Sequence, residues 1–372
     1  MITPKLRRTS AVAALGAAAL ALTASACSVT PASSSSTSSS SGSTASASGG
    51  SNTSTSGNSD SSSAGKVGYS ESFLTDPFQV QLVKQIGLQA TSQTVDILPA
   101  TNANNDPGKQ STDVQTLLGE NVKGLIVAPI DSSAISPVIA QANGKGVPVV
   151  TVDKGPSAGS AKAFMIVRAN NVTMGQEACQ AMGKALGGKG KVLNLQGSLS
   201  DINGQDRSNG FTQCMAKDFP AITVVSKPME WKTEECGTQA QTVVSTTQIQ
   251  GLFEASESVC LNSVEHALSS AKKLTKTGTP GHIYTAAIDG TPGGLAAVRA
   301  GLLDVDVSQP LNLYAQYAVY YIKAAMAGKS FAPGADGHGG TIVKFGNSQM
   351  DLLPPTPVTA ANASDKTLWG NS

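Results

Sequence analysis

Short apolar runs alternate, along the body of this chain, with longer stretches whose apolar residues recur every three or four positions. The first kind is typical of buried strands, and the second of helices that pack one face on a sheet. In the first part of the body, strands are predicted at residues 66–70, 94–98, 124–128 and 147–152, with helices at 78–90, 108–118 and 134–143. This alternation predicts a parallel sheet covered by helices.

The pattern restarts after a strand predicted at residues 164–167. Helices are then predicted at 172–186, 205–218, 234–247, 259–274 and 292–300, and strands at 192–196, 222–226, 251–254, 283–288 and 303–307. A last helix at 311–327 and a strand at 341–345 are left to pack on the first sheet. The expected fold is therefore α/β, with two Rossmann-like lobes whose parallel sheets are joined by a hinge.

The lobes are predicted to be discontinuous in sequence. The N-terminal lobe would comprise residues 66–168 and 310–345, and the C-terminal lobe residues 169–309 and 346–372. The hinge would lie where the chain passes between them, near residues 168–171, near 309–310 and just after 345.

The first 27 residues have the pattern of a bacterial secretion signal. Basic residues at positions 5, 7 and 8 precede an apolar run at 11–24, and Cys27 follows. The end of this run resembles a lipobox, which implies cleavage before Cys27 and lipidation of its thiol and new amine. Residues 24–26, Ala-Ser-Ala, also fit an ordinary cleavage site. A membrane span is disfavoured because the run is shorter than the ~20 apolar residues that a bilayer needs.

Residues 28–65 are almost wholly Ser, Thr, Gly and Ala. Such a segment cannot bury enough apolar surface to offset its ordering entropy, so we expect a disordered linker. Together, signal and linker predict an extracytoplasmic protein that is anchored to the cell membrane by lipid.

Composition narrows the possible partners. The formal net charge is +1, and no run of Lys and Arg occurs beyond the signal, so nucleic acid is not an expected partner. The hydrophobic fraction of 40% suffices for buried cores.

Four cysteines remain once Cys27 is set aside, namely Cys179, Cys214, Cys236 and Cys260. An even number in an oxidising compartment favours two disulfides, and buried free thiols are the alternative. Cys179 and Cys214 fall on apolar faces of helices that flank one predicted strand, while Cys236 and Cys260 begin successive helices. We therefore predict the pairs Cys179–Cys214 and Cys236–Cys260.

Polar and aromatic residues follow most of the predicted strands. Because ligands of open α/β sheets bind beyond the carboxyl ends of the strands, these positions are candidates for a site. They comprise Thr75 to Phe78, Asp131, Asp153 and Lys154, Asp206 and Arg207, Glu230 and Trp231, Ser256 and Glu257, Asp289, and Gln309. Each aspartate could instead only cap the helix that follows it.

Four segments in this series carry a family resemblance: Thr-Asp-Pro-Phe at 75–78, Val-Asp-Lys at 152–154, Arg-Ser-Asn-Gly-Phe at 207–211 and Ile-Asp-Gly-Thr-Pro at 288–292. With their spacing, residues 66–345 resemble the type I periplasmic sugar-binding proteins of ABC importers, especially the ribose-binding branch. The resemblance implies a set of ligand contacts: Asp76, Phe78, Asp153, Lys154, Arg207, Trp231, Ser256, Asp289 and Gln309. Several positions depart from the ribose pattern. Asp76, Ala128 and Ser256 stand where that pattern has Asn, Gln79 and Trp231 replace Phe, and Lys154 replaces Arg.

These residue types suit a polyhydroxylated ligand on chemical grounds as well. Each sugar hydroxyl both donates and accepts, so a buried pocket needs carboxylates such as Asp153 and Asp289 beside donors such as Lys154 and Arg207. The rings of Phe78 and Trp231 would sandwich the apolar face of a sugar, although Trp231 could instead anchor its own loop.

Enzymatic readings find less support. Asp153, Glu257 and Asp289 could be imagined as glycosidase carboxylates, yet no feature selects a pair. The three histidines, His266, His282 and His338, lack metal-ligand spacing and are interpreted as surface or helix-end residues, so no metal or cofactor is expected.

The sequence thus predicts a non-enzymatic, monomeric solute-binding lipoprotein. It would capture a sugar or small polyol between its lobes and deliver it to the membrane subunits of an ABC importer. A secreted carbohydrate-active enzyme and a ligand-sensing module for a membrane kinase are the alternatives.

Overall fold

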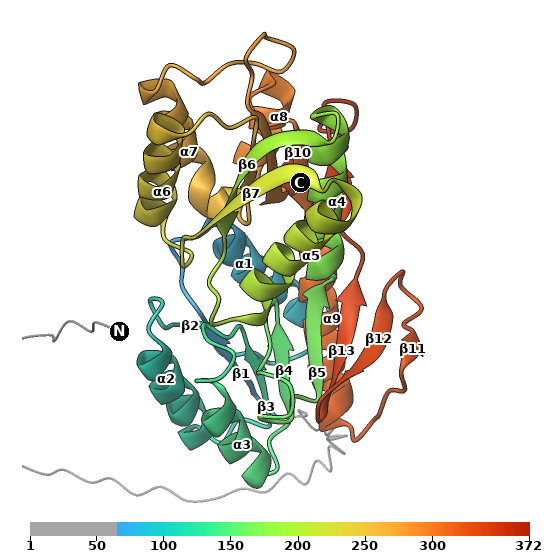
Figure 1. Cartoon of the computed structure of the whole chain (residues 1–372). Coiled ribbons are helices and arrows are strands. Elements are labelled where there is room, and N and C mark those ends of the chain that lie inside the picture. The colour runs from blue at the N-terminus through green and yellow to red at the C-terminus, as the bar shows by residue number, and fades with distance from the viewer. Residues whose placement is uncertain (1–64) are drawn as a thin grey trace, which may run out of the picture. The chain divides into compact units, whose positions relative to one another are not determined.

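The computed structural model describes residues 65–372 (Figure 1). The signal sequence, the lipidation site at Cys27 and all but the last residue of the predicted linker lie outside the described residues. Within residues 65–372, every helix is too short or too polar to cross a bilayer.

The first lobe is built on an eight-stranded sheet, in the lower half of Figure 1, with the order β11-β12-β13-β5-β4-β3-β1-β2. Its strands are β1 (Val67–Glu71), β2 (Thr101–Asn102), β3 (Gly124–Val127), β4 (Val149–Val152), β5 (Met165–Ala169), β11 (Gly334–Ala335), β12 (Thr341–Phe345) and β13 (Ser348–Leu353). Its helices are α1 (Pro77–Ser92), α2 (Pro107–Gly119), α3 (Ser136–Gly144) and α9 (Leu311–Met326). The pairs β11–β12 and β12–β13 are antiparallel, and the other neighbouring strands of this sheet are parallel.

Alternation along β3 shows why helices cover both faces of this sheet. Ile126 belongs to the core under α1 and α9, whereas Leu125 and Val127 belong to the core under α2 and α3. Successive side chains of a strand point to opposite faces, so a strand that is apolar throughout must be buried on both.

The second lobe has a six-stranded sheet with the order β14-β10-β9-β8-β6-β7, in which only β14 is antiparallel. Its strands are β6 (Lys189–Gln196), β7 (Ala221–Pro228), β8 (Gly251–Glu254), β9 (Tyr284–Asp289), β10 (Val305–Ser308) and β14 (Thr356–Val358). Its helices are α4 (Asn171–Ala185), α5 (Ile202–Asp218), α6 (Thr233–Thr246), α7 (Glu257–Ser270), α8 (Pro292–Ala300) and the short 3-10 helix η1 (Trp369–Asn371). The two-lobed α/β fold predicted from the sequence is therefore confirmed.

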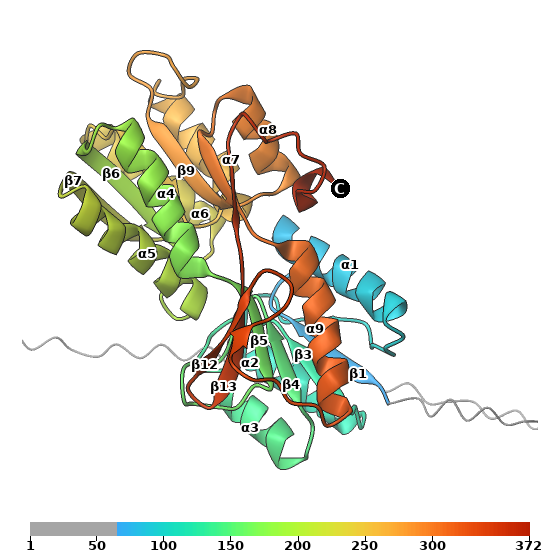
Figure 2. The same cartoon turned by 90° about the vertical axis from the view of Figure 1, so that its right-hand side faces the viewer.

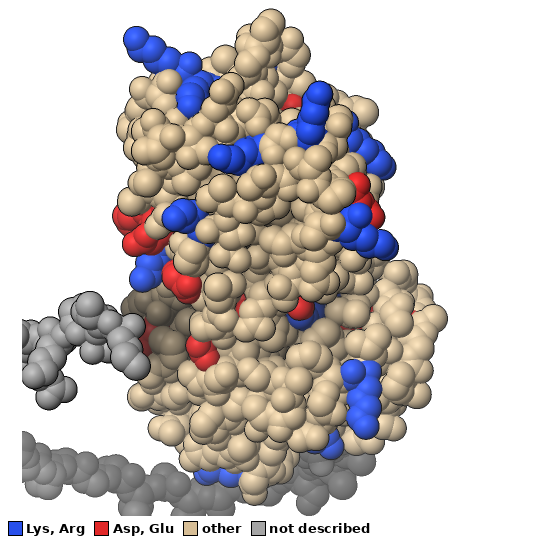
Figure 3. Space-filling view, in the orientation of Figure 1, with Lys and Arg blue, Asp and Glu red and all other residues tan. Residues whose placement is uncertain are grey.

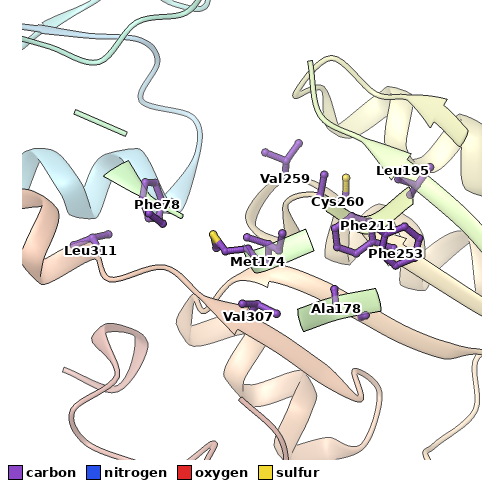
Figure 4. Packing of buried hydrophobic residues seen from close by; sticks show 14 of the residues in the cluster. Phe78, Met174, Ala178, Leu195, Phe211, Phe253, Val259, Cys260, Val307 and Leu311 are labelled. Atoms are coloured by element: carbon purple, nitrogen blue, oxygen red, sulfur yellow. The ribbon is translucent and has the colours of Figure 1, made fainter. Parts of the chain in front are cut away.

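Aromatic stacking organises the core of the second lobe. The rings of Phe211 on α5 and Phe253 on β8 stack at 4.4 Å between centroids. Figure 4 shows Met174 and Ala178 of α4 beside them in the same buried cluster. This packing fixes α4 and α5 against the sheet.

The chain passes between the lobes three times: between β5 and α4, between β10 and α9, and between β13 and β14 (Figure 2). The first two crossings lie where the sequence predicts them. The third lies after Leu353, because β13 pairs in parallel with β5 of the first sheet. Residues 346–353, which we expected in the C-terminal lobe, therefore belong to the first sheet. Asp351 in the middle of β13 interrupts the apolar pattern that would have revealed this strand.

One predicted strand is wrong. Residues 94–98 form no regular strand, and contribute only an isolated bridge between Ile97 and Val67. The edge position is taken instead by the two-residue strand β2. Thr94 has a positive φ of 57°, which breaks the extended run at its first residue.

Two disulfides, Cys179–Cys214 and Cys236–Cys260, join the pairs predicted from the sequence. The first links α4 to α5 and the second links α6 to α7. Both lie in the second lobe, and each ties together two helices that are neighbours in space.

Replacing both cysteines of either disulfide by alanine should lower the free energy of unfolding by about 3 to 4 kcal/mol. Each disulfide closes a loop in the unfolded chain, between cysteines 35 and 24 residues apart, and its removal gives that loop back its conformational freedom. Alanine avoids burying a new hydroxyl at these positions. Urea unfolding of the two double variants measures the effect, and an unchanged midpoint in both would contradict this account.

Candidate functional site

All nine residues that the resemblance implied as ligand contacts line one cavity, which has an empty volume of about 300 Å³. Four further residues line it that were not in that set, namely Phe73, Gln79, Asn203 and Val259. The residues come from both lobes, so the cavity lies between them. That these residues bind a ligand remains a prediction at this point.

The first lobe positions its residues through the start of α1. The carboxylate of Asp76 caps this helix by accepting from the backbone N–H of Phe78 at 3.0 Å, and Pro77 at the first helical position favours the same start. The ring of Phe78 then packs edge-on against Tyr314 and Trp369, with centroids 6.0 and 5.7 Å apart. It is 2% exposed, and thus a core residue at the edge of the cavity.

Asp153 follows β4 and joins the two lobes. Its carboxylate accepts from Nε2 of Gln79 at 3.0 Å and, across the cleft, from Nδ2 of Asn203 at 2.8 Å. Asn203 lies in the first turn of α5, where the carboxylate of Asp201 caps the helix. Gln79 is marked in the sequence only as a departure from the ribose pattern, and Asn203 was missed because no strand-end position or family segment marks it.

Asp289 is the most heavily bonded acid of the site. Its Oδ2 accepts from the hydroxyls of Ser256 and Ser258 at 2.6 and 2.8 Å. Its Oδ1 accepts from Nε2 of Gln309 at 2.6 Å and from Nη1 of Arg207 at 3.3 Å. Asp289 and Arg207 both belong to the ligand contacts that the resemblance implied, whereas Ser258 does not.

Arg207 is held in one orientation by groups other than Asp289. Its Nε donates to Oδ1 of Asn171 at 2.7 Å, and its Nη1 donates to the carbonyl of Ala255 at 2.6 Å. The guanidinium carbon lies 5.7 Å from the centroid of the Trp231 ring, within range of a cation–π contact.

Trp231 is both a loop anchor and a wall of the cavity. Its Nε1 donates to Oδ2 of Asp201, so its own lobe orients the ring. Gly197 makes room for it, because a Cβ at that position would lie 2.1 Å from Cη2 of the indole. On the cavity side, Nζ of Lys154 lies 5.4 Å from the ring centroid. Trp231 therefore anchors its loop, as the alternative proposed, and in addition lines the cavity.

Several strand-end residues named as candidates lie outside the cavity lining. Asp131 caps the turn that follows it, accepting from the N–H groups of Ser133 and Ala134. Asp206 pairs with Arg168 at 2.8 Å. Glu257 accepts from the backbone and hydroxyl of Thr291. For these residues the capping or structural alternative applies.

Contacts across the cleft hold the lobes together in this structure. The hydroxyl of Ser132 accepts from the N–H of Ile202 at 3.1 Å, and Arg168 of β5 pairs with Asp206 of α5. With the bond between Asp153 and Asn203, these contacts bridge the two lobes beside the cavity. Figure 3 shows one face of the molecule, in the orientation of Figure 1. On that face Lys and Arg are spread among uncharged residues rather than gathered in one patch.

Burial changes the ionisation of two acids in the site. Burial and, to a lesser extent, the nearby charge of Asp289 together raise the pKa of Asp76 to about 7. Burial also raises the pKa of Asp153, and Lys154 and Arg207 offset part of that effect.

The chain matches the model of the periplasmic binding protein domain over residues 67–330. It therefore belongs to this family. This assignment confirms the resemblance drawn from the sequence, and it rests on more than half of the chain.

Two relatives of this periplasmic binding protein illustrate its similarities. It is 29% identical to the ribose import binding protein RbsB of Bacillus subtilis, over 71% of this chain and 82% of that protein. It is 31% identical to a xylitol-binding protein of Mycolicibacterium smegmatis over 54% of this chain and 55% of that protein.

Solved structures show the same fold. A solute-binding protein of an ABC transporter from Bacillus halodurans, with bound myo-inositol, has a TM-score of 0.70 at 20% identity and covers 83% of this chain and 99% of its own. One from Mycobacterium smegmatis, with bound glycerol, has a TM-score of 0.69 at 22% identity, covering 81% and 96%.

The substitution Asp76→Asn should abolish part of the pH dependence of stability. Because the pKa of Asp76 in the folded chain is about 7, ionisation of this group favours the unfolded chain, and its contribution to wild-type stability is lost as the pH rises from about 4 to 7. Asn keeps the cap without the charge. Its advantage over wild type should grow by at most about 3 kcal/mol between pH 5 and pH 8.

Urea unfolding at the two pH values measures this difference. Asp106→Asn is the matched control, since Asp106 also caps a helix ahead of a proline but is exposed. An Asp76→Asn variant whose advantage stays the same at both pH values would contradict the assignment.

Proposed function

We propose that this periplasmic binding protein captures a sugar or small polyol in the cavity between its lobes and delivers it to an ABC importer, without catalysing a reaction. The observation that carries the proposal is that the cavity presents both donors and acceptors whose bonding capacity is unfilled. A hydroxyl is the group that matches both.

The unfilled acceptors come from two side-chain amides. Within residues 65–372, Oε1 of Gln79 and Oδ1 of Asn203 are buried and have no hydrogen-bond partner. The amide nitrogen of each is already bonded to Asp153, so the carbonyl oxygen is the end left over. An unpaired buried acceptor costs free energy, and a ligand O–H would remove that cost.

The main unfilled donor is the ammonium of Lys154. This residue is 5% exposed, and its closest carboxylate oxygen, on Asp201, is 3.6 Å away. A buried ammonium has three N–H donors and needs acceptors nearby. Ligand hydroxyl oxygens beside Lys154 would supply them, while the Trp231 ring offers an apolar face for the ligand's C–H groups.

The size of the cavity favours a small ligand. Its empty space of about 300 Å³, part of which is open to solvent, is lined closely by residues of both lobes, which leaves room only for a small ligand. The names of the relatives agree, because they refer to ribose and xylitol, and structural neighbours hold myo-inositol and glycerol.

Contacts from both lobes would couple binding to closure. A ligand that bonds Gln79 and Lys154 on one side and Asn203 and Arg207 on the other binds the closed arrangement better than an open one. Such differential affinity shifts the population toward the closed state, in which the importer would accept the protein.

A thermal-shift screen against ribose, xylitol, D-allose and myo-inositol tests the proposal. At least one should raise the melting temperature, because a ligand at ~100 times its Kd adds roughly 2.7 kcal/mol. Recovery of that compound unchanged after long incubation distinguishes binding from turnover. Chemical conversion of the compound would favour the enzyme alternative.

For the compound that binds, Asp289→Ala should weaken affinity by about 2 to 5 kcal/mol, since it leaves Arg207 buried without its partner. Trp231→Ala should cost less, because it removes contact area without stranding a charge. Asp131→Ala is the control, being a strand-end aspartate outside the cavity. Calorimetry showing Asp289→Ala within threefold of wild type would refute the role given to Asp289.

We also propose that Cys27 is lipidated and anchors the protein to the cell membrane. This rests on the sequence alone, from the apolar run before Cys27 and the polar linker after it. In cells, Cys27→Ser should release the protein into the medium or leave it unprocessed. Detergent-phase partitioning measures this, and equal partitioning of variant and wild type would exclude the anchor.

A further inference from the structure

Three side chains that could ligate a metal converge at the edge of the first sheet, away from the residues that line the cavity. They are Asp336 and His338, in the turn between β11 and β12, and Asp351 on β13. One ligand atom from each lies within 4.8 Å of the others. Nε2 of His338 is 2.9 Å from a carboxylate oxygen of Asp336 and 2.9 Å from one of Asp351.

Each carboxylate has one oxygen that accepts no hydrogen bond from the described part of the chain. Oδ1 of Asp336 accepts from the N–H groups of His338 and Gly340 at 2.8 and 2.9 Å, which aims Oδ2 at the imidazole. Within residues 65–372, Oδ1 of Asp351 is buried and has no hydrogen-bond partner. Oδ2 of Asp336 is also buried; it faces Nε2 of His338 at 2.9 Å but accepts no aligned hydrogen bond from these residues. The side chains of both aspartates are 0% exposed.

The turn is shaped around these oxygens. A Cβ at Gly340 would lie 2.2 Å from Oδ2 of Asp336 and 3.2 Å from Oδ1 of Asp351, so only glycine leaves this space. Gly337 and Gly339 adopt positive φ angles of 83° and 96°, which bring the turn back over β13.

Neighbours on α9 orient the other ligands. The ring of Tyr317 stacks on that of His338 with centroids 3.4 Å apart. The hydroxyl of Tyr321 donates to Oδ2 of Asp351 at 2.9 Å. Such second contacts hold metal ligands in place in known sites.

Charge also favours a cation. Among the described residues, no Lys or Arg forms an ion pair with Asp336 or Asp351, so two buried carboxylates share only one imidazole. Buried carboxylates without a compensating charge are costly, and a divalent ion would neutralise both.

The geometry points to a binding site for a divalent transition metal, with Asp336, His338 and Asp351 as its three protein ligands. Imidazole and carboxylate together suit Zn²⁺ or Mn²⁺ better than Ca²⁺ or Mg²⁺, which prefer oxygen alone. Ligand bonds of about 2.0 to 2.2 Å in a tetrahedron place ligand atoms about 3.3 to 3.6 Å apart. Small side-chain shifts from the 2.9 Å separations would therefore admit the ion.

The bound ion would act as a cross-link. It would tie the turn between β11 and β12 to β13, at an edge where β11 is only two residues long and exposed. The expected consequence is a more stable first lobe, because an ion that binds only the folded chain stabilises it by mass action.

His282 provides a matched control within the same chain. It also pairs with an aspartate, Asp304, at 2.8 Å, and its side chain is 12% exposed against 11% for His338. It lacks a second carboxylate, and so should not hold an ion.

The test uses the purified chain without a polyhistidine tag, stripped by chelator and titrated with Zn²⁺ in a calorimeter. We expect one Zn²⁺ per chain and a higher melting temperature. Asp336→Asn and His338→Gln should each weaken binding at least tenfold and lose the thermal shift, whereas His282→Gln should keep both. Co²⁺ in place of Zn²⁺ should give visible absorption bands that the first two variants lack.

Far-ultraviolet circular dichroism shows that each variant is folded before its titration is interpreted. Asp336→Asn retains Oδ1 as an acceptor, so the turn itself should persist. Absence of stoichiometric Zn²⁺ or Mn²⁺ binding by the wild type, equal binding by all three variants, or tighter binding of Ca²⁺ than of Zn²⁺ would each overturn the proposal.

Discussion

Asp289 is a buried carboxylate to which separate segments of the chain are bonded. Its side chain accepts from Arg207 on α5, from two serines at the start of α7 and from Gln309 in the second crossing. Its backbone carbonyl accepts from the N–H of Gln309 at 2.9 Å and from Nε1 of Trp369 at 3.0 Å. A buried charge is tolerated only when it is bonded in this way, so the position of each partner is set by the need to satisfy it.

The network extends from Asp289 into the segments that connect the lobes. The hydroxyl of Tyr314 donates to Oε1 of Gln309 at 2.9 Å. The same hydroxyl oxygen of Tyr314 accepts from the N–H of Ala169 at 2.6 Å. Ala169 ends β5 at the first crossing, and Gln309 lies in the second. Two crossings and the wall of the cavity are therefore joined by hydrogen bonds, which gives a change at Asp289 a direct route to the relative orientation of the lobes.

The strand-end part of the site could be predicted because parallel strands end at a common edge. That rule leads to Asp153, Asp289 and their neighbours, and the resemblance selects among the remaining candidates. The rule does not reach Asn203, and the resemblance names Gln79 only as a departure from the ribose pattern. Their part in the site, two amides bonded to the one carboxylate of Asp153, becomes visible only when the two lobes are packed together. The rule also cannot show that Asp131 serves as a cap, because the same residue type at the same place serves either purpose.

Two features escaped prediction for one reason, namely that a buried acid looks like a surface residue in sequence. Asp351 interrupts the apolar pattern of β13, so no strand was predicted there. The same residue completes the cluster with Asp336 and His338. Metal ligands can be recognised in a sequence when they recur at a regular spacing along one element. Here a turn supplies Asp336 and His338, and a separate strand supplies Asp351. The cost of burying Asp351 is visible only once its neighbours are known.

The third crossing also bears on the order in which the molecule folds. The register of β13 against β5 pairs Met350 with Ile166, so the first sheet needs residues from both ends of the described chain. Most of the second lobe, from α4 to β10, is contiguous and can collapse on local contacts. Closing the first sheet requires a long loop to form first, which is entropically slow. We therefore expect the first sheet to be completed after the contiguous part of the second lobe has formed.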